Sequence, residues 1–149
     1  MRLIAIASLL LLAACASSPQ RQAGGGAPAV RAADFGLTRE AAIEVCEPAG
    51  QRAYLASLAC PDGRRPEFER TGNVGARQDL PEGLSEADTD RLLDDMFSKR
   101  PLRAGEPDHH IVDAYRVACG GTATTLYLDM YHCGTKPPSV APVGFTFGP

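Results

Sequence analysis

Two strand-like runs on either side of Gly120-Gly121 constrain the fold of this chain more than any other feature. Residues 110–119 and 122–132 are rich in β-branched and aromatic side chains, which favour β-strands. A Gly-Gly pair between such runs is typical of the tight turn of a β-hairpin, because glycine adopts positive φ without steric cost. We therefore predict an antiparallel hairpin with a two-residue loop.

The register of this hairpin sorts its side chains onto two faces. The two-residue loop places Tyr115 opposite Leu126, and side chains alternate between the faces along each strand. Asp113 falls among the apolar residues, opposite Leu128, where the sequence offers it no partner. We expect the other face to be solvated or covered by a partner, although its carboxylate and phenols could act in general acid/base chemistry. The predicted core face carries Ile111, Tyr115, Val117, Leu126, Leu128 and Met130, and the other face carries Arg116, Tyr127, Asp129 and Tyr131.

The hairpin also limits how the cysteines can pair. Cys46, Cys60, Cys119 and Cys133 are too far apart in the chain for the close pairs of a structural zinc site, and none lies in a Cys-x-x-Cys motif. We therefore predict two disulfides, for which three pairings are possible. Cys119 lies at the turn of the hairpin and Cys133 at its open end. Strands that rise roughly 3.3 Å per residue separate them far beyond the ~7 Å limit between bonded cysteines, so each is expected to bond to Cys46 or Cys60.

Residues 84–97 form the clearest predicted helix. Ser85 is a favourable N-cap, and Asp88 three residues later completes a variant of the capping box. The apolar residues of the segment recur at helical spacing, so we expect one stripe that packs on the sheet. This stripe consists of Leu92, Leu93, Met96 and Phe97.

A second, shorter helix is predicted upstream. Residues 37–46 have Thr38 as an N-cap and an acidic residue in the first turn, both of which favour a helix start. Pro48 cannot continue helical hydrogen bonding and is expected to end this helix.

Residues 53–60 are ambiguous between helix and strand. Their Ala and Leu content favours a helix, whereas their alternation is that of a half-buried strand. We favour the strand, because turn chemistry at residues 61–64 could return it to a partner strand at residues 66–71. The predicted fold of residues 34–149 is therefore a single α+β domain, with a small antiparallel sheet of two β-hairpins and two helices, stapled by two disulfides.

The first residues of the chain predict export. Met1-Arg2 precede an apolar run of about ten residues, which is typical of a signal peptide and too short to span a bilayer. The run ends at Leu12-Ala13-Ala14-Cys15, which resembles the lipobox of bacterial lipoproteins. This resemblance implies cleavage before Cys15 and acylation of that residue; the alternative is ordinary secretory cleavage near Ala14. Outside the lipobox we identify no family resemblance.

The lipobox also implies a domain organisation and a location. Residues 1–14 would be the signal peptide. Residues 15–33, rich in Gly, Pro and small residues, would be the lipidated cysteine and a flexible tether. Several acyl chains, palmitate among them, would hold Cys15 stably in a membrane. Ala16 stands where, by likeness to the family, an aspartate would favour the inner membrane, so we expect the periplasmic face of the outer membrane.

The histidines offer candidate metal ligands. The hairpin register makes His109 and His132 neighbours across the two strands, with Asp108 adjacent in sequence. Such a set could bind Zn²⁺ or Cu²⁺ if a further ligand completed the coordination shell. Because the sequence does not reveal a third protein ligand beside the histidines, we favour an exposed, hydrogen-bonded histidine pair.

Charge and motifs narrow the function classes. With 15 basic and 18 acidic residues, the chain lacks the basic surface of a nucleic-acid-binding protein, and we expect no such partner. No serine lies in a Gly-x-Ser-x-Gly motif and no glycine-rich phosphate loop is present, so we predict neither catalytic residues nor a cofactor. We expect a membrane-anchored, non-enzymatic lipoprotein that binds another envelope component. The alternative is a metal-binding or hydrolytic lipoprotein that uses the His109 and His132 end of the hairpin.

Overall fold

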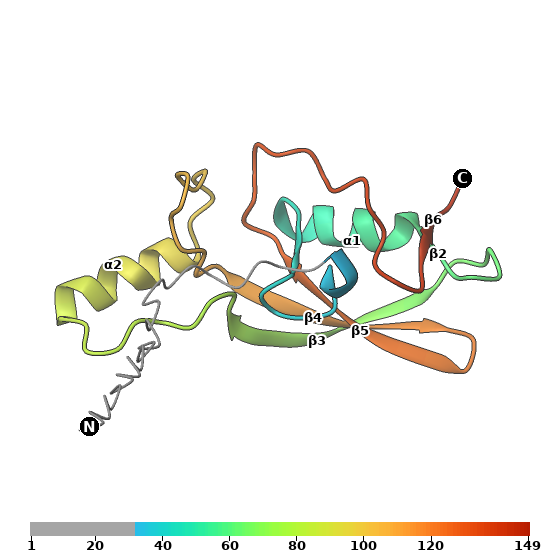
Figure 1. Cartoon of the computed structure of the whole chain (residues 1–149), viewed down its shortest axis with the longest axis horizontal. Coiled ribbons are helices and arrows are strands. Elements are labelled where there is room, and N and C mark those ends of the chain that lie inside the picture. The colour runs from blue at the N-terminus through green and yellow to red at the C-terminus, as the bar shows by residue number, and fades with distance from the viewer. Residues whose placement is uncertain (1–31) are drawn as a thin grey trace, which may run out of the picture.

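The computed structural model describes residues 32–149. Cys15, the predicted signal peptide and nearly all of the predicted tether lie outside the described residues. Residues 32–149 form an α+β structure with two α-helices and two disulfides, which confirms the predicted fold class (Figure 1). Within this range, neither helix has the length and apolar character needed to cross a membrane.

A mixed sheet of four strands forms the base of the domain. The elements in chain order are the 3-10 helix η1 (Ala32–Asp34), β1 (Ile43–Glu44), α1 (Glu47–Ser57), β2 (Leu58–Ala59), β3 (Glu67–Ala76), α2 (Glu86–Met96), β4 (Ile111–Cys119), β5 (Thr122–Asp129) and β6 (Thr146–Phe147). The strand order of the large sheet is β1-β5-β4-β3, and β2 and β6 form a separate two-stranded sheet. β1 runs parallel to β5, whereas all other pairs are antiparallel.

The predicted hairpin is confirmed as β4 and β5. Tyr115 lies opposite Leu126, and Asp113 lies opposite Leu128, as the two-residue loop requires. β3 pairs with the other edge of β4 along a ladder with two irregularities. The long strands of the sheet therefore follow one another as β3, β4 and β5, and bring the end of β3 beside the open end of the hairpin.

The hydrophobic core lies between α1 and one face of the large sheet. Figure 1 shows α1 running along this face, and the buried residues of both elements form one cluster. Most of the predicted core face is confirmed, although Ile111 and Met130 are only half-buried. The core residues are Ile43, Val45, Tyr54, Leu55, Leu58, Tyr115, Val117, Leu126 and Leu128.

The prediction of a helix at residues 37–46 is wrong. Oγ1 of Thr38 accepts a hydrogen bond from the N–H of Ala41 at 3.2 Å, but this contact closes a turn, and the chain then enters β1. The helix begins instead at Glu47, with Pro48 in its first turn. A helix has no internal acceptor for its first N–H groups, so proline is favourable there. Pro48 thus helps to start a helix rather than to end one.

The prediction of a strand at residues 53–60 is also wrong. Residues up to Ser57 belong to α1, and the short strand β2 that follows pairs with β6. Residues 66–71 do enter a strand, β3, but its partner is β4. Helical propensity prevails here because the apolar side chains of α1 meet the core at helical spacing.

Helix α2 is confirmed, but its apolar stripe does not pack on the sheet. The N–H of Asp88 donates to Oγ of Ser85 at 3.2 Å, which confirms the predicted N-cap. Met96 is buried, whereas Leu93 and Phe97 are 47% and 59% exposed. Figure 1 shows that α2 lies beyond the end of the sheet, away from α1.

The two disulfides connect the hairpin to both ends of helix α1. Cys46, directly before α1, is bonded to Cys133, and Cys60, directly after β2, is bonded to Cys119. The predicted exclusion of a Cys119–Cys133 bond is therefore confirmed.

Candidate metal centre

A buried group of ionisable side chains lies at the open end of the β4/β5 hairpin. Asp108 and His110 precede β4, Asp129 is the last residue of β5, and His132 follows it. One potential ligand atom from each residue lies within 4.8 Å of those of the other three. We call these four residues the Asp/His cluster.

Backbone hydrogen bonds between the segment just after β3 and the segment just before β4 orient Asp108 and His110. The N–H of Arg77 donates to the carbonyl oxygen of His110 at 2.9 Å, and the N–H of Gln78 donates to that of Asp108 at 3.1 Å. Side chains alternate along such an extended segment, so Asp108 and His110 share one side and His109 lies on the other. Nδ1 of His109 is instead 3.4 Å from the carbonyl oxygen of Gln78.

The prediction that His109 and His132 form a pair is therefore wrong. Strand β5 ends at Asp129, so the hairpin ladder stops before it reaches these residues. The N–H of His132 donates to the carbonyl oxygen of Val45 instead, at 3.1 Å. His110 takes the place of His109, with its ring centroid 5.1 Å from that of His132. Asp108 and His132 do belong to the site.

The prediction that Asp129 and Tyr131 lie on a face that is solvated or covered by a partner is also wrong, because both residues are buried within the domain. Their exposed fractions are 0% and 7%. Oδ1 of Asp129 accepts a hydrogen bond from the N–H of Tyr131 at 3.0 Å. The Tyr131 ring stacks on His110 at a centroid distance of 5.4 Å, and Phe97, just after α2, lies edge-on to the same ring. Segments from outside the hairpin thus cover the side of Asp129 and Tyr131 that strand alternation assigns to solvent.

His132 links the two carboxylates of the cluster. Its Nε2 is 3.0 Å from Oδ2 of Asp108 and 3.0 Å from Oδ2 of Asp129. Burial alone would lower the pKa of His132, but these two carboxylates raise it to about 10. Burial would raise the pKa of Asp108, but contacts with His110 and His132 and the charge of Arg77 lower it well below its usual range. Without a metal ion, His132 is therefore protonated and Asp108 ionised at neutral pH.

Arg77 adds a second positive charge to the cluster. Its Nη1 is 2.8 Å from Oε1 of Glu44, 3.0 Å from Oδ2 of Asp108 and 3.7 Å from Oδ2 of Asp129. The same atom is 3.4 Å from Nε2 of His132. The Arg77 side chain is only 12% exposed, so its charge is poorly hydrated. These carboxylates compensate for the lost hydration.

One fully buried nitrogen of the cluster lacks a hydrogen bond. Nδ1 of His110 is buried and has no hydrogen-bond partner among the residues that the structure describes. It lies 2.9 Å from Oδ1 of Asp108 and 3.7 Å from Oδ2 of Asp129. The shorter distance is within hydrogen-bonding range, but the direction is not that of a hydrogen bond. Buried polar atoms without a partner are rare, so each one needs an explanation.

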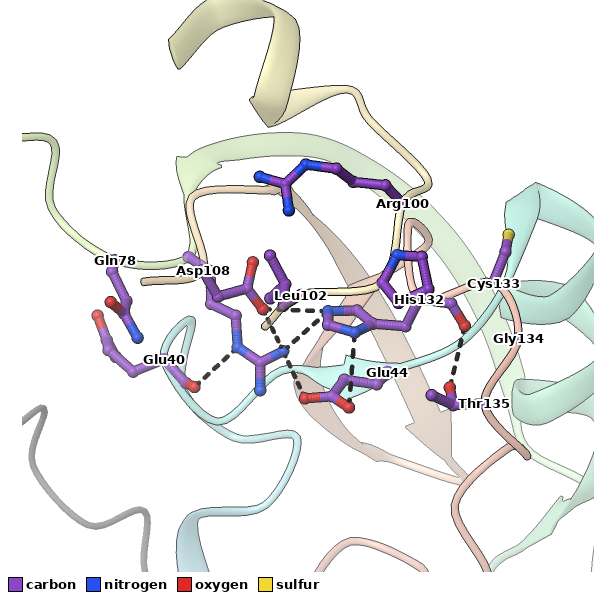
Figure 2. Close-up of a pocket in the computed structure, with 12 residues that line it drawn as sticks. Glu40, Glu44, Gln78, Arg100, Leu102, Asp108, His132, Cys133, Gly134 and Thr135 are labelled. Atoms are coloured by element: carbon purple, nitrogen blue, oxygen red, sulfur yellow. Dashed lines mark hydrogen bonds and ion pairs between the residues drawn. The ribbon is translucent and has the colours of Figure 1, made fainter. Parts of the chain in front are cut away.

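A pocket with a volume of about 440 Å³ opens beside the cluster. Figure 2 shows Glu44, Asp108 and His132 turned toward one another at this pocket, with Arg100 also lining it. Asp129 and His110 are more deeply buried, at 0% and 2% exposed. The pocket therefore gives access to the cluster from the side of Asp108 and His132.

Two imidazoles and two carboxylates form a ligand set that proteins use for transition metals. Imidazole nitrogen suits zinc, copper, iron and nickel, and carboxylate oxygen also binds zinc. Comparison of the chain with protein-family models, with curated proteins and with solved structures found no match.

The sequence contains part of the signal for this site. Asp108 and His110 are two residues apart, which places them on one side of an extended segment. Our prediction paired His109 instead, because it extended the hairpin ladder past its end. Arg77 and Glu44 lie far from the hairpin in sequence, and no sequence pattern indicates that they approach it.

Proposed function

We propose that this protein is an extracytoplasmic lipoprotein whose domain binds one divalent transition-metal ion at the Asp/His cluster. The observation that carries the proposal is the convergence of two imidazoles and two carboxylates, with ligand atoms within 4.8 Å of one another, in a buried site. Buried carboxylates are costly unless a cation offsets their charge. Without metal, Arg77 and His132 offset the charge of the carboxylates. A bound ion would take over this role and would also give Nδ1 of His110 the partner that it lacks.

The ligand set favours Zn²⁺, with Cu²⁺ as the nearest competitor. Zinc sites in proteins are mostly tetrahedral, with nitrogen, sulfur and oxygen ligands. Asp108, His110, Asp129 and His132 would together fill such a shell. Four protein ligands leave no coordination position for a reacting water, so the geometry favours metal binding over hydrolysis.

Zinc titration of matched histidine variants tests this proposal. We would titrate the chelator-treated mature protein, kept in detergent, against a chromophoric zinc chelator. His110→Ala removes a cluster ligand and is expected to weaken zinc binding by roughly tenfold or more, since even residues outside the coordination shell have effects of that size. His109→Ala alters the neighbouring histidine, which lies outside the cluster, and should stay within about twofold of wild type by the same comparison. Equal effects of both variants, or a wild type that binds no zinc, would refute the proposal.

The location of the protein is part of the proposal. The lipobox resemblance at Cys15 supports a lipid anchor, and the two disulfides suit an oxidising compartment outside the cytoplasm. Labelling of cells with a palmitate analogue should mark the wild type but not Cys15→Ser, and the mature protein should fractionate with the outer membrane. An unlabelled wild type would contradict the anchor, and fractionation with the inner membrane would contradict the predicted location.

Helix α2 supports a second candidate function, which is the binding of an envelope protein. Leu93 and Phe97 are 47% and 59% exposed, and acidic side chains outnumber basic ones on the same helix. A partner with an apolar centre and a basic rim would complement this surface. The acidic residues of α2 are Glu86, Asp88, Asp90, Asp94 and Asp95.

Photocrosslinking in cells tests the second candidate. A photoreactive residue that replaces Arg91 in α2 should form a crosslink to one protein, at a basic segment of that protein. The double variant Leu93→Ser/Phe97→Ser should abolish this crosslinked product. The matched control replaces Val140 and Val143, which are exposed apolar residues outside α2, and should leave the product intact. Absence of a product, or equal loss in both double variants, would exclude α2 as the contact surface.

A further inference from the structure

The position of Arg77 indicates how the cluster could remain folded without metal. Nη1 of Arg77 lies 3.0 Å, 3.7 Å and 3.4 Å from Oδ2 of Asp108, Oδ2 of Asp129 and Nε2 of His132. These three atoms belong to three of the four proposed metal ligands. We infer that Arg77 is a resident cation of the metal-free cluster, and that it must withdraw when the ion binds and thereby sets the metal affinity. This inference rests on the proposed function.

Distance and charge both require the withdrawal. A zinc ion lies about 2.0–2.2 Å from nitrogen and oxygen ligands. An ion held by Asp108, Asp129 and His132 would therefore occupy the position of Nη1 or lie within a few ångströms of it. Arginine side chains keep their positive charge in proteins, so loss of a proton does not relieve the repulsion. The site is also poorly solvated, so the repulsion is weakly screened.

The structure provides a place for the displaced side chain. Arg77 lines the pocket beside the cluster, where Glu44 also lies. Nε of Arg77 donates to the carbonyl oxygen of Glu40 at 3.1 Å, and Nη1 contacts Glu44, which is 42% exposed. A shift toward the pocket can therefore release Asp108 and Asp129 while the guanidinium keeps an acidic partner.

A second arginine of the domain offers a matched control. Nη2 of Arg70 lies 2.6 Å from Oδ1 of Asp113, which is also a buried carboxylate. Asp113 is not one of the four cluster residues. Loss of the Arg70 charge therefore breaks another arginine–aspartate pair, with a more exposed arginine, without emptying the cation position of the cluster.

Zinc affinity of arginine variants tests the inference. In the full mature protein, Arg77→Gln should bind zinc at least tenfold more tightly than wild type. The zinc affinity should stay within threefold of the wild-type value in Arg77→Lys, which keeps the charge, and in Arg70→Gln. Without metal, Arg77→Gln should melt at a lower temperature than wild type, and zinc should raise its melting temperature by more than it raises that of wild type.

The outcomes separate the inference from the proposed function. If the wild type binds zinc and Arg77→Gln binds it no more tightly, the inference is overturned and the proposed function stands. If the wild type binds no zinc, the proposed function is refuted and the inference falls with it, whether or not Arg77→Gln binds zinc. A second measurement does not depend on the folding of a variant: zinc should shift the NMR resonance of the Arg77 Nε–H group in the wild type and leave that of Arg70 in place. An unchanged Arg77 resonance at zinc saturation would overturn the inference.

Discussion

Nη2 of Arg70 on β3 lies 2.6 Å from Oδ1 of Asp113 on β4, and this contact gives a core carboxylate its charged partner. The other oxygen of Asp113 accepts a hydrogen bond from Nε2 of Gln51 at 3.0 Å, and Gln51 in turn accepts one from the hydroxyl of Tyr115 at 2.9 Å. The network joins β3, β4 and α1. It makes a 3% exposed aspartate compatible with the core, since a buried charge without partners would be very costly.

We expect Arg70→Met to destabilise the fold through this network. Because the Arg70 side chain is 49% exposed, the free energy of unfolding should fall by about 2 kcal/mol, less than the roughly 3–5 kcal/mol lost when a fully buried pair is broken. Urea unfolding at pH 7 measures the change. Arg91→Met, which breaks an exposed ion pair with Asp88 on α2, should cost no more than about 0.5 kcal/mol. Similar losses in both variants would show that burial of Asp113 does not matter.

The two disulfides should contribute similarly to stability but differently to metal binding. Their sequence separations of 87 and 59 residues correspond to about 4 kcal/mol of chain-entropy stabilisation each. Replacement of Cys46 and Cys133 by alanine should also weaken zinc binding about tenfold, since Cys133 adjoins His132 and supports its position. Replacement of Cys60 and Cys119 should leave zinc affinity within about twofold of wild type. Titration and urea unfolding of both double variants measure these effects, and equal zinc affinities would contradict the expected coupling.

Gly36 should tolerate no side chain. Its φ is +72°, and a Cβ atom there would lie 2.7 Å from Cδ1 of Ile43 in the core. Gly36→Ala should therefore lower the free energy of unfolding by about 2–4 kcal/mol, as backbone strain and overpacking add. Gly105 has a similar φ of +79° with no atom near the added Cβ, so Gly105→Ala should cost only about 1–2 kcal/mol. Equal losses in denaturant melts would mean that the contact with Ile43 relaxes without cost.

Loss of the Ser85 cap should loosen α2 locally. Ser85→Ala removes the hydrogen bond to the N–H of Asp88, which is worth about 1 kcal/mol at a helix N-terminus. Because most of α2 is exposed, we expect amide hydrogen exchange in the helix to quicken about fivefold while the urea midpoint barely moves. Ser139→Ala, at an exposed position of the C-terminal segment, is the control. A large shift in the midpoint would instead mean that α2 is cooperative with the core.

Features set by near neighbours in the chain could be predicted. The Gly120-Gly121 turn sets the hairpin register, which places Tyr115 opposite Leu126 and excludes a bond between Cys119 and Cys133. The Ser85 cap of α2 is equally local, because a side chain and an N–H three residues away decide it.

Features that depend on neighbours distant in sequence could not be predicted. Pro48 is compatible with either end of a helix, and the packing of α1 on the sheet decides which. Strand alternation assigns Asp129 to solvent, but it says nothing of the segments that cover that side. The apolar residues of α2 recur at helical spacing, but this spacing does not show whether they pack on the sheet.

The sequence by itself determined the central hairpin, the α2 helix, the oxidised state of the cysteines and the α+β class, because each follows from short-range sterics, hydrogen bonding or residue spacing. Only the tertiary structure decided the composition of the Asp/His cluster and the positions of Arg77 and Arg70. The ladder between β3 and β4 aligns residues more than thirty positions apart and so brings Arg70 and Arg77 to their aspartates. The β4/β5 hairpin brings Asp129 and His132 to Asp108 and His110. Neighbouring side chains of an extended segment point to opposite sides. A difference of one residue, from His109 to His110, therefore decides which side chain enters the site.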